Sequence, residues 1–301
     1  MLDPADWGSD HVGKPIPEYV TGDECLFCHR MDVGPTWPAN RHNLTLRPPR
    51  SDEAAVQALK EAPGLRGMAD EVKLLLGNSE RVRFLKRSDG YGKLDLHSVE
   101  WQPPSPGEDG RLVVTESPHW DAAAFGNRCA GCHTTAVDSK TRAFSALALD
   151  CFTCHGDVPL AHSKDGRLAH LGKKRTEPAA VTASICGQCH LRDGTSVSTG
   201  LPYPNNFVAG DNLFRDFKVD LSPETIAQLN PADGHVLDNI RHVVLLAKEE
   251  MTCLTCHDVH SSSTRKHHRL AKQDYCWHCH NPTGSMKDRK PYEVHSKACG
   301  Y

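Results

Sequence analysis

Short apolar stretches along this chain are separated by polar and turn-forming clusters. Residues 52–77, broken at Pro63-Gly64, predict two short helices. Residues 80–117 carry β-prone runs between turn clusters, which predicts strands. Residues 238–250 are amphipathic and predict a helix, whereas residues 201–235 predict a loop. The pattern therefore indicates a mainly α and irregular chain with a small β-containing insert.

The apolar content is too small for a conventional core. Hydrophobic residues make up 38% of the 301 residues and aromatic residues only 6%, and the mean hydropathy is -0.52. Twenty prolines and 23 glycines are typical of a turn-rich backbone. Side chains this sparse cannot comfortably offset the entropy lost on ordering the chain. We therefore expect a non-protein group to fill part of the interior.

Twelve of the 13 cysteines fall into six copies of Cys-Xaa-Xaa-Cys-His. A shuffled chain of this composition would contain roughly 0.03 copies, so the repetition is not accidental. The motifs are Cys25/Cys28/His29, Cys129/Cys132/His133, Cys151/Cys154/His155, Cys186/Cys189/His190, Cys253/Cys256/His257 and Cys276/Cys279/His280.

This spacing is that of covalent haem attachment. Two thiols separated by two residues reach the two vinyl groups of one haem, and the following histidine binds the iron. Six motifs predict six haems c, which would serve as cofactor and as core. Zinc ribbons do not require a histidine after each second cysteine, and a disulfide framework leaves the six histidines without a role. A thioredoxin-like dithiol needs one motif, not six.

The second axial ligand decides whether each haem iron is closed, with a protein ligand on both sides, or open, with one coordination position left for a substrate. Of the 19 histidines, 13 lie outside the motifs, which is ample because six would close every iron. The five methionines show no recurring candidate ligand. An iron with two histidine ligands passes electrons, whereas an open position binds substrate. We therefore expect bis-histidine ligation throughout.

The motif spacing divides the chain into four predicted segments. Residues 1–50 hold one haem, 51–120 form a haem-free and partly β insert, 121–200 hold a cluster of three haems, and 201–301 contain a loop, a helix and the last two haems. Motifs only 22, 23 and 35 residues apart leave little protein between successive haems. We expect those haems to lie near contact.

Charge and hydropathy exclude other classes of protein. The net charge of -3, without a basic block, gives no basis for nucleic-acid binding. No stretch approaches the ~20 apolar residues of a membrane span. The segment after Met1 lacks the basic start and apolar run of a signal peptide. Because haem is normally attached to such motifs outside the cytoplasm, we expect an exported, periplasmic or extracellular protein whose leader is absent from this sequence.

Five stretches in or near the motifs follow one another in a specific order. The likeness that they carry runs from about residue 20 to the end of the chain. They are Trp37-Pro-Ala-Asn-Arg-His42, Cys129-Ala-Gly-Cys-His-Thr-Thr135, Cys151-Phe-Thr-Cys-His-Gly156 with His162, Asp233-Gly-His-Val-Leu-Asp238 and Met251-Thr-Cys-Leu-Thr-Cys-His-Asp-Val-His260. In these the chain resembles the multihaem cytochromes c related to the tetrahaem nitrification cytochrome, including relatives fused to tetratricopeptide repeats. The resemblance implies a haem-cored fold with stacked haem pairs and distal histidines from remote positions.

The resemblance also implies particular distal ligands, namely His42, His162, His260 and His295. We add His119, which lies within Ser117-Pro-His-Trp, and His242 on the predicted helix; a surface or hydrogen-bonded histidine is the alternative for each. For five other histidines we favour that alternative: His97, His170, His267, His268 and His278. The family often has Gly-Pro-Gly after the third motif, whereas this chain has Gly156-Asp-Val-Pro159.

The last residues, from His295 to Tyr301, resemble the opening of another attachment motif at Cys299. They predict a longer natural protein with a seventh haem. The alternative is an unpaired or intermolecular cysteine.

The expected function is electron transfer to and from redox protein partners, without catalytic residues. One form would be a homo-oligomer or extracellular filament, in which His11 ligates a haem of a neighbouring subunit. An oxidoreductase of small nitrogen or sulfur compounds would need one open haem flanked by acid–base residues. Its Lys-terminated motif is absent, because all six copies end in His. A third hypothesis is a haem subunit docked to a larger redox complex through residues 30–128.

Overall fold

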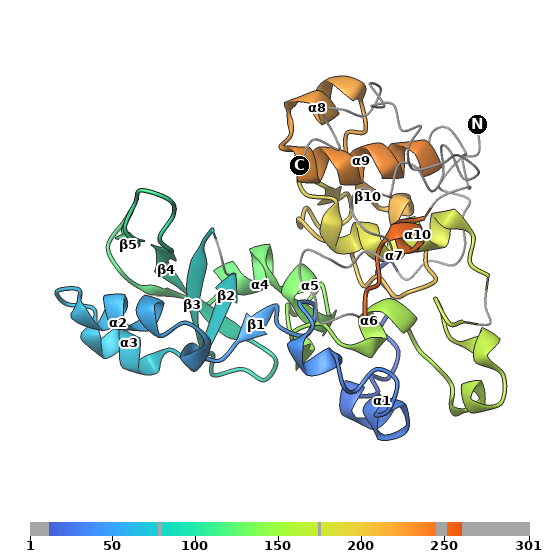
Figure 1. Ribbon diagram of the computed structural model, residues 1–301, viewed down its shortest axis with the longest axis horizontal. Helices are drawn as coiled ribbons and strands as arrows, with labels where there is room; N and C mark the ends of the chain where they lie inside the picture. The colour runs from blue at the N-terminus through green and yellow to red at the C-terminus, as the bar shows by residue number, and fades with distance from the viewer. Residues whose placement is uncertain (1–11, 78–79, 174–175, 245–251, 261–301) are drawn as a thin grey trace, which may run out of the picture.

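The computed structural model describes residues 12–77, 80–173, 176–244 and 252–260. An antiparallel sheet with two covering helices lies at one end of the molecule, and the helices that carry the cysteine motifs gather at the other (Figure 1). Among the described residues, no helix is long and apolar enough to cross a membrane. Helices and small antiparallel sheets thus share the fold, as the sequence pattern predicts.

The main sheet has six antiparallel strands in the order β1-β2-β3-β4-β5, with β6 also paired to β4. Its core pairing sets Leu75 opposite Phe84 and Leu85 opposite Leu96. The prediction that residues 52–77 are wholly helical is wrong at its end, because Leu74–Gly77 pairs with the next strand. The strands are β1 (Leu46–Arg47), β2 (Leu74–Gly77), β3 (Val82–Arg87), β4 (Leu94–Gln102), β5 (Arg111–Val113) and β6 (Trp120–Asp121).

Two helices, α2 (Glu53–Glu61) and α3 (Arg66–Glu71), cover one face of this sheet. Asp52 begins α2 by accepting a hydrogen bond from the backbone N–H of Ala55 at 3.2 Å, as an N-cap does. The predicted break at Pro63-Gly64 is confirmed, and Gly64 adopts a φ of +77° between the helices. The helices complete a cluster whose buried members are Ala55, Leu59, Leu65, Ala69, Val72, Leu75, Val82, Phe84, Val99 and Trp101.

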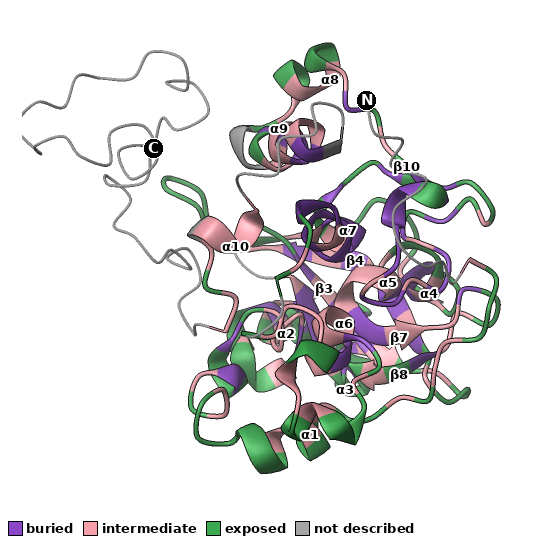
Figure 2. Cartoon of the chain, turned by 90° about the vertical axis from the view of Figure 1, so that its right-hand side faces the viewer, coloured by how far each residue is buried: buried purple, intermediate pink, exposed green. Residues whose placement is uncertain are grey.

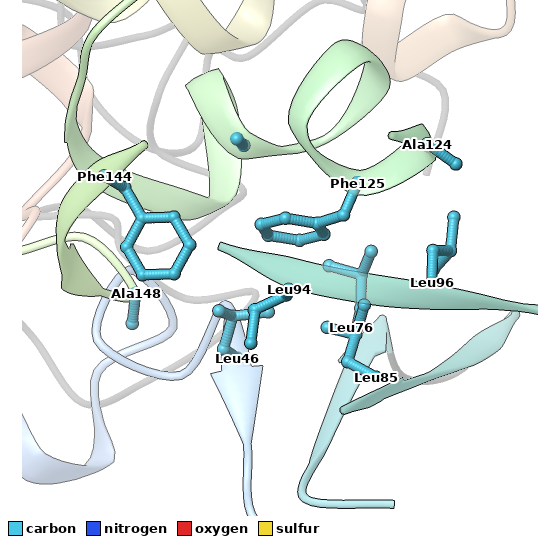
Figure 3. Close-up of a cluster of buried hydrophobic side chains, with 10 residues drawn as sticks. Leu46, Leu76, Leu85, Leu94, Leu96, Ala124, Phe125, Phe144 and Ala148 are labelled. Atoms are coloured by element: carbon cyan, nitrogen blue, oxygen red, sulfur yellow. The ribbon is translucent and has the colours of Figure 1, made fainter. Parts of the chain in front are cut away.

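A second apolar cluster joins the sheet to the motif-bearing region. Leu94 and Leu96 of β4 pack toward Phe125 of α4 (Ala124–Arg128), and Phe144 closes the cluster (Figure 3). The rings of Phe125 and Phe144 meet edge to face, with their centroids 6.1 Å apart. Ala130, inside the second motif, belongs to the same cluster. The sheet therefore shares a core with the motif region.

Each described motif is built around a helix, and its histidine is either the last residue of that helix or the residue after it. On a helix, residues three apart face the same side, so the two thiols of a motif project together and the histidine follows at the next position. The helices are α1 (Gly22–His29), α5 (Ala130–His133), α6 (Cys151–His155), α7 (Ala179–His190) and α10 (Cys253–Cys256). Helix α7 is mostly buried, whereas α1 has no buried residue (Figure 2).

The region after α7 is more ordered than the predicted loop over 201–235. Helix α8 (Pro223–Gln228) forms because Ser222 caps it and Pro223 suits its first position. Helix α9 (Pro231–Val244) begins well before residue 238, and its predicted end at residue 250 lies outside the described residues. Leu237 and Ile240 of α9 pack in a third cluster with Leu213 and Phe217.

Short elements complete the chain. They are the hairpin β7 (Thr134–Val137) and β8 (Phe144–Leu147), the pair β9 (Thr195–Ser196) and β10 (Phe217–Lys218), and the 3-10 turns η2 (Trp37–Ala39), η3 (Pro49–Ser51), η4 (Leu160–Ser163), η5 (Gly166–Leu168) and η6 (Leu213–Arg215). The β7–β8 hairpin connects the second motif to the third and keeps them close together.

Candidate haem-attachment sites

Five of the six motifs fall within the described residues. The sixth motif, Cys276, Cys279 and His280, lies outside them, as do the candidate residues near the two ends: His11, His267, His268, His278, His295 and Cys299. Nine motif cysteines, from Cys25 to Cys253, form no disulfide bond in the described part of the chain. They are therefore available for thioether bonds.

The first motif lies beside the third, although 126 residues separate Cys25 from Cys151 in the sequence. The thiols of Cys25 and Cys151 are close enough to interact electrostatically. Tyr19, just before α1, donates a hydrogen bond to the Asp150 carboxylate, and the Gly22 N–H points to the same carboxylate at 3.3 Å. The first motif, although alone within residues 1–50, therefore lies against the third in space, because the segment before α1 packs along α6.

The fourth motif, on α7, is surrounded by three others. The Cys189 thiol is close enough to Cys132 of the second motif to interact with it electrostatically. Cys186 has the same relation to Cys253 from the fifth motif. Cys154 of the third motif is close enough to interact electrostatically with both α7 cysteines. The motifs thus converge on α7, the most buried of the motif-bearing helices.

Three motif histidines each face a histidine from a remote segment. His29 faces His162, with ring centroids 6.1 Å apart and planes inclined at 24°. The other two pairs are His190 with His42, at 6.3 Å and 84°, and His155 with His260, at 6.0 Å and 33°. An imidazole nitrogen binds a metal at about 2 Å, so two rings on opposite sides of one iron have centroids roughly 6 Å apart. The spacing of all three pairs fits a shared haem iron.

Three of these rings use Nδ1 for a hydrogen bond, so that Nε2 is the nitrogen that could bind a metal. His155 Nδ1 lies 2.6 Å from the His170 carbonyl oxygen, and His162 Nδ1 lies 2.8 Å from that of Pro159. His29 Nδ1 lies 3.3 Å from the Asp32 carboxylate. Such bonds on the far nitrogen fix the tautomer and orientation of a metal-binding histidine.

Burial keeps the motif histidines His133 and His155, and also His260, in the neutral form. It lowers the pKa of His133 to about 4 and lowers the pKa values of His155 and His260. Desolvation disfavours the protonated ring, so each of these imidazoles is neutral near pH 7. Only a neutral imidazole has a lone pair to give to a metal.

His257, the predicted proximal ligand of the fifth motif, differs in placement from the other described motif histidines. Those four are the last residues of their helices, whereas α10 ends at Cys256 and His257 follows it with an extended backbone, at φ -97° and ψ 131°. The His257 N–H donates to the Cys253 carbonyl oxygen at 2.9 Å and so closes the helix. His257 belongs to none of the three ring pairs above. Its expected role as an iron ligand is therefore not confirmed by this geometry and stays a prediction.

The structure does not bring every predicted distal ligand to a described motif. His119 is exposed, and its Nδ1 lies 2.8 Å from the Ser117 carbonyl oxygen. His242 lies on α9 with its Nδ1 4.0 Å from the Asp238 carboxylate. Within the described ranges, neither forms a ring pair with a motif histidine. His133 likewise has no such partner among the residues that the structure describes.

Two further histidines belong to the packing around the motifs. His97 is fully buried, accepts a hydrogen bond from the Val99 N–H at 3.0 Å and meets the Trp120 ring at 4.6 Å. This confirms the hydrogen-bonded alternative for His97. His170 offers its backbone carbonyl to His155, a contact that sequence reasoning missed because any residue type carries that group.

Comparison with known proteins gives the fold. No family model matches the chain. The solved structure of the outer cell wall cytochrome OcwA is similar, with a TM-score of 0.57 and 21% identity over 89% of this chain and 68% of OcwA. The undecaheme cytochrome from the S-layer of Carboxydothermus ferrireducens gives a TM-score of 0.49 and 18% identity over 89% of this chain and 43% of the other.

The repeated motif, the fold and the curated match agree on the class of protein that this chain is similar to, the multihaem c-type cytochromes. The curated match is the multiheme cytochrome MtrA of Shewanella baltica (strain OS185). It is 29% identical over 160 residues, which span 51% of this chain and 40% of MtrA. The likeness thus covers less than half of that relative's length.

Proposed function

We propose that this chain transfers electrons through six covalently attached c haems, each with two histidine ligands. The observation that carries the proposal is the spacing of the three histidine pairs, 6.0–6.3 Å between centroids. Each haem supplies a reversible ferric–ferrous couple when bound. An iron closed on both sides has no position for a substrate, which favours a carrier over an enzyme.

The chain's own residues divide the work of holding these haems. Both cysteines of each motif form the thioethers. His162, His42 and His260 are the distal ligands opposite His29, His190 and His155. The attached macrocycles complete a core that the sparse apolar side chains leave thin. The proximal ligands are the six motif histidines, His29, His133, His155, His190, His257 and His280, and the remaining distal candidates are His119, His242 and His295.

The setting follows from the attachment chemistry. Because haem is normally joined to this motif outside the cytoplasm, we place the protein in the periplasm or outside the cell. Its partners are then other redox proteins that give and take electrons. Assembly into a homo-oligomer or filament is a further form of the same function.

Intact mass and electron paramagnetic resonance test the proposal together. The mass should exceed that of the polypeptide by six haems, and the oxidised protein should show low-spin ferric signals alone. Fewer than six increments would contradict the haem count. A high-spin component that disappears on adding cyanide would reveal an open iron and favour an oxidoreductase.

A matched pair of variants tests one distal ligand. His162→Ala should open the iron of the first motif and add a high-spin ferric component. Ser163→Ala, in the same turn of η4, should leave the spectrum unchanged. If the two variants give the same spectrum, His162 is not a ligand.

A further inference from the structure

The chain between the third and fourth motifs carries His162, and it also contacts the histidine of the third motif. It returns to the third motif, where the His170 carbonyl oxygen accepts a hydrogen bond from His155 Nδ1 at 2.6 Å. This is the shortest of the Nδ1 contacts described above. The position of the His155 ring therefore depends on what holds His170 in place.

A buried carboxylate holds the His170 side chain. His170 Nδ1 lies 2.9 Å from Glu177 Oε1, and only 5% of the Glu177 side chain is exposed, against 21% for His170. A carboxylate loses much solvation when it is buried this far, so it is placed there only with hydrogen-bond partners. Glu177 stands directly before Pro178, which caps α7, so the bond ties His170 to the helix of the fourth motif.

A glycine closes the other side of the His170 ring. Gly210 has a φ of +101°, and a Cβ at that position would lie 2.3 Å from His170 Nε2. A side chain there would have to displace the ring or the backbone. The His170 ring is thus enclosed between the Glu177 carboxylate and the Gly210 backbone.

We propose that His170 and Glu177 are positioning residues for His155, the proximal ligand of the third motif. This inference rests on the proposed function, because it assumes that His155 binds an iron. Glu177 holds the His170 ring, the held residue presents its carbonyl oxygen, and the carbonyl sets the plane of the His155 imidazole and its strength as a donor. Partners of this kind tune a metal through its ligand without touching the metal.

Four variants test the proposal by electron paramagnetic resonance of the oxidised protein, with haem content from intact mass. Glu177→Ala removes the acceptor, and Glu177→Gln keeps an oxygen that can accept from His170. Gly210→Ala adds a methyl group that displaces the His170 ring from the side opposite Glu177. Arg167→Gln is the control, because it breaks an exposed pair with Asp165 in the same loop. A fifth variant, His260→Ala, opens the iron that His155 faces and so identifies its signal.

In Glu177→Ala and in Gly210→Ala, that one low-spin signal should shift while the others stay in place. Glu177→Gln should stay close to the unaltered protein, and Arg167→Gln should match it. Identical spectra for the alanine variants and the unaltered protein would overturn the inference. So would a shift in Arg167→Gln, or one in Glu177→Gln as large as in Glu177→Ala. If Glu177→Ala does not fold, Gly210→Ala decides.

The proposed function has its own readout in the same experiment. If His260→Ala leaves every signal unchanged, the ligand pair itself is wrong and the proposed function fails at this site. If His260→Ala produces a high-spin iron but the Glu177 and Gly210 variants do nothing, only the positioning role fails.

Discussion

At the scale of single residues, Asp150 joins the first and third motifs. Its carboxylate caps α6 by accepting from the Phe152 N–H at 3.1 Å, and it also accepts from Tyr19. Burial raises the pKa of Asp150, and the hydrogen bond from Tyr19 opposes that rise. The tyrosine hydroxyl thus compensates a buried charge at the point where the two segments meet.

Tyr19→Phe should destabilise the protein by about 1–3 kcal/mol near neutral pH, because a buried carboxylate loses a donor. The substitution keeps the aromatic ring and its edge-to-face contact with Phe152, in which the ring centroids are 5.7 Å apart. Burial raises the pKa of Asp150 in the folded protein. Above that pKa the carboxyl group is charged and its burial costs free energy; below it the group is protonated and this cost disappears. The effect of the variant should therefore shrink in acid. Urea unfolding at several pH values measures it, with exposed Tyr91→Phe as the control; equal destabilisation at all pH values would contradict it.

The three ring angles predict different magnetic signatures. Nearly parallel imidazole planes split the iron d orbitals strongly and give rhombic low-spin signals, which we expect for the pairs at 24° and 33°. Nearly perpendicular planes leave those orbitals almost degenerate and give a highly anisotropic signal. The pair at 84° should be of this second kind, and it should disappear in His42→Ala. An anisotropic signal that survives this substitution belongs to another iron.

At the scale of elements, the sequence pattern predicts those that form from local signals. The helices on either side of Pro63-Gly64 are recognisable from their break, and the strands after residue 80 from their β-prone runs. The two-residue strands β1 and β6 are not, since each exists only because a neighbouring strand accepts it. Helix α8 lies in residues 201–235, for which the sequence pattern predicts a loop, although Ser222-Pro223 is a signal for the start of a helix.

Leu59→Ala tests whether α2 is held by its packing on the sheet. Leu59 is fully buried in the cluster beneath α2, so removing it should cost about 2–5 kcal/mol of unfolding free energy. Haem content should not change, because that cluster holds no motif residue. Lys60→Ala, at the exposed neighbouring position, is the control for helix propensity. Haem loss in Leu59→Ala would show that the sheet and the motifs fold as one unit.

At the scale of the whole molecule, the sequence predicts the content of the site better than its layout. The motifs and the candidates His42, His162 and His260 can be named from the residues around them. Their pairing with particular motif histidines could not, because each pair joins segments far apart in the chain. The same holds for the contact between the first and third motifs, which depends on tertiary packing that no local pattern records.

The convergence of motifs on α7 predicts unequal effects of losing a haem. Cys186→Ser with Cys189→Ser, and Cys25→Ser with Cys28→Ser, should each lower the intact mass by one haem. The α7 variant should shift the midpoint potentials of the remaining haems more, because its cysteines lie beside those of three other motifs. Charges at short range influence one another most strongly. A spectroelectrochemical titration measures the shifts, and equal shifts in the two variants would contradict the central place of α7.

The remote pairing of histidines also sets an order of maturation for a chain that emerges from its N-terminus. With the proposed ligands, the iron at His29 must wait until His162 has emerged. The iron at His190 finds His42 already present, whereas the iron at His155 stays open until His260 arrives. Truncated chains of increasing length would therefore close their irons in the sequence first, fourth, third.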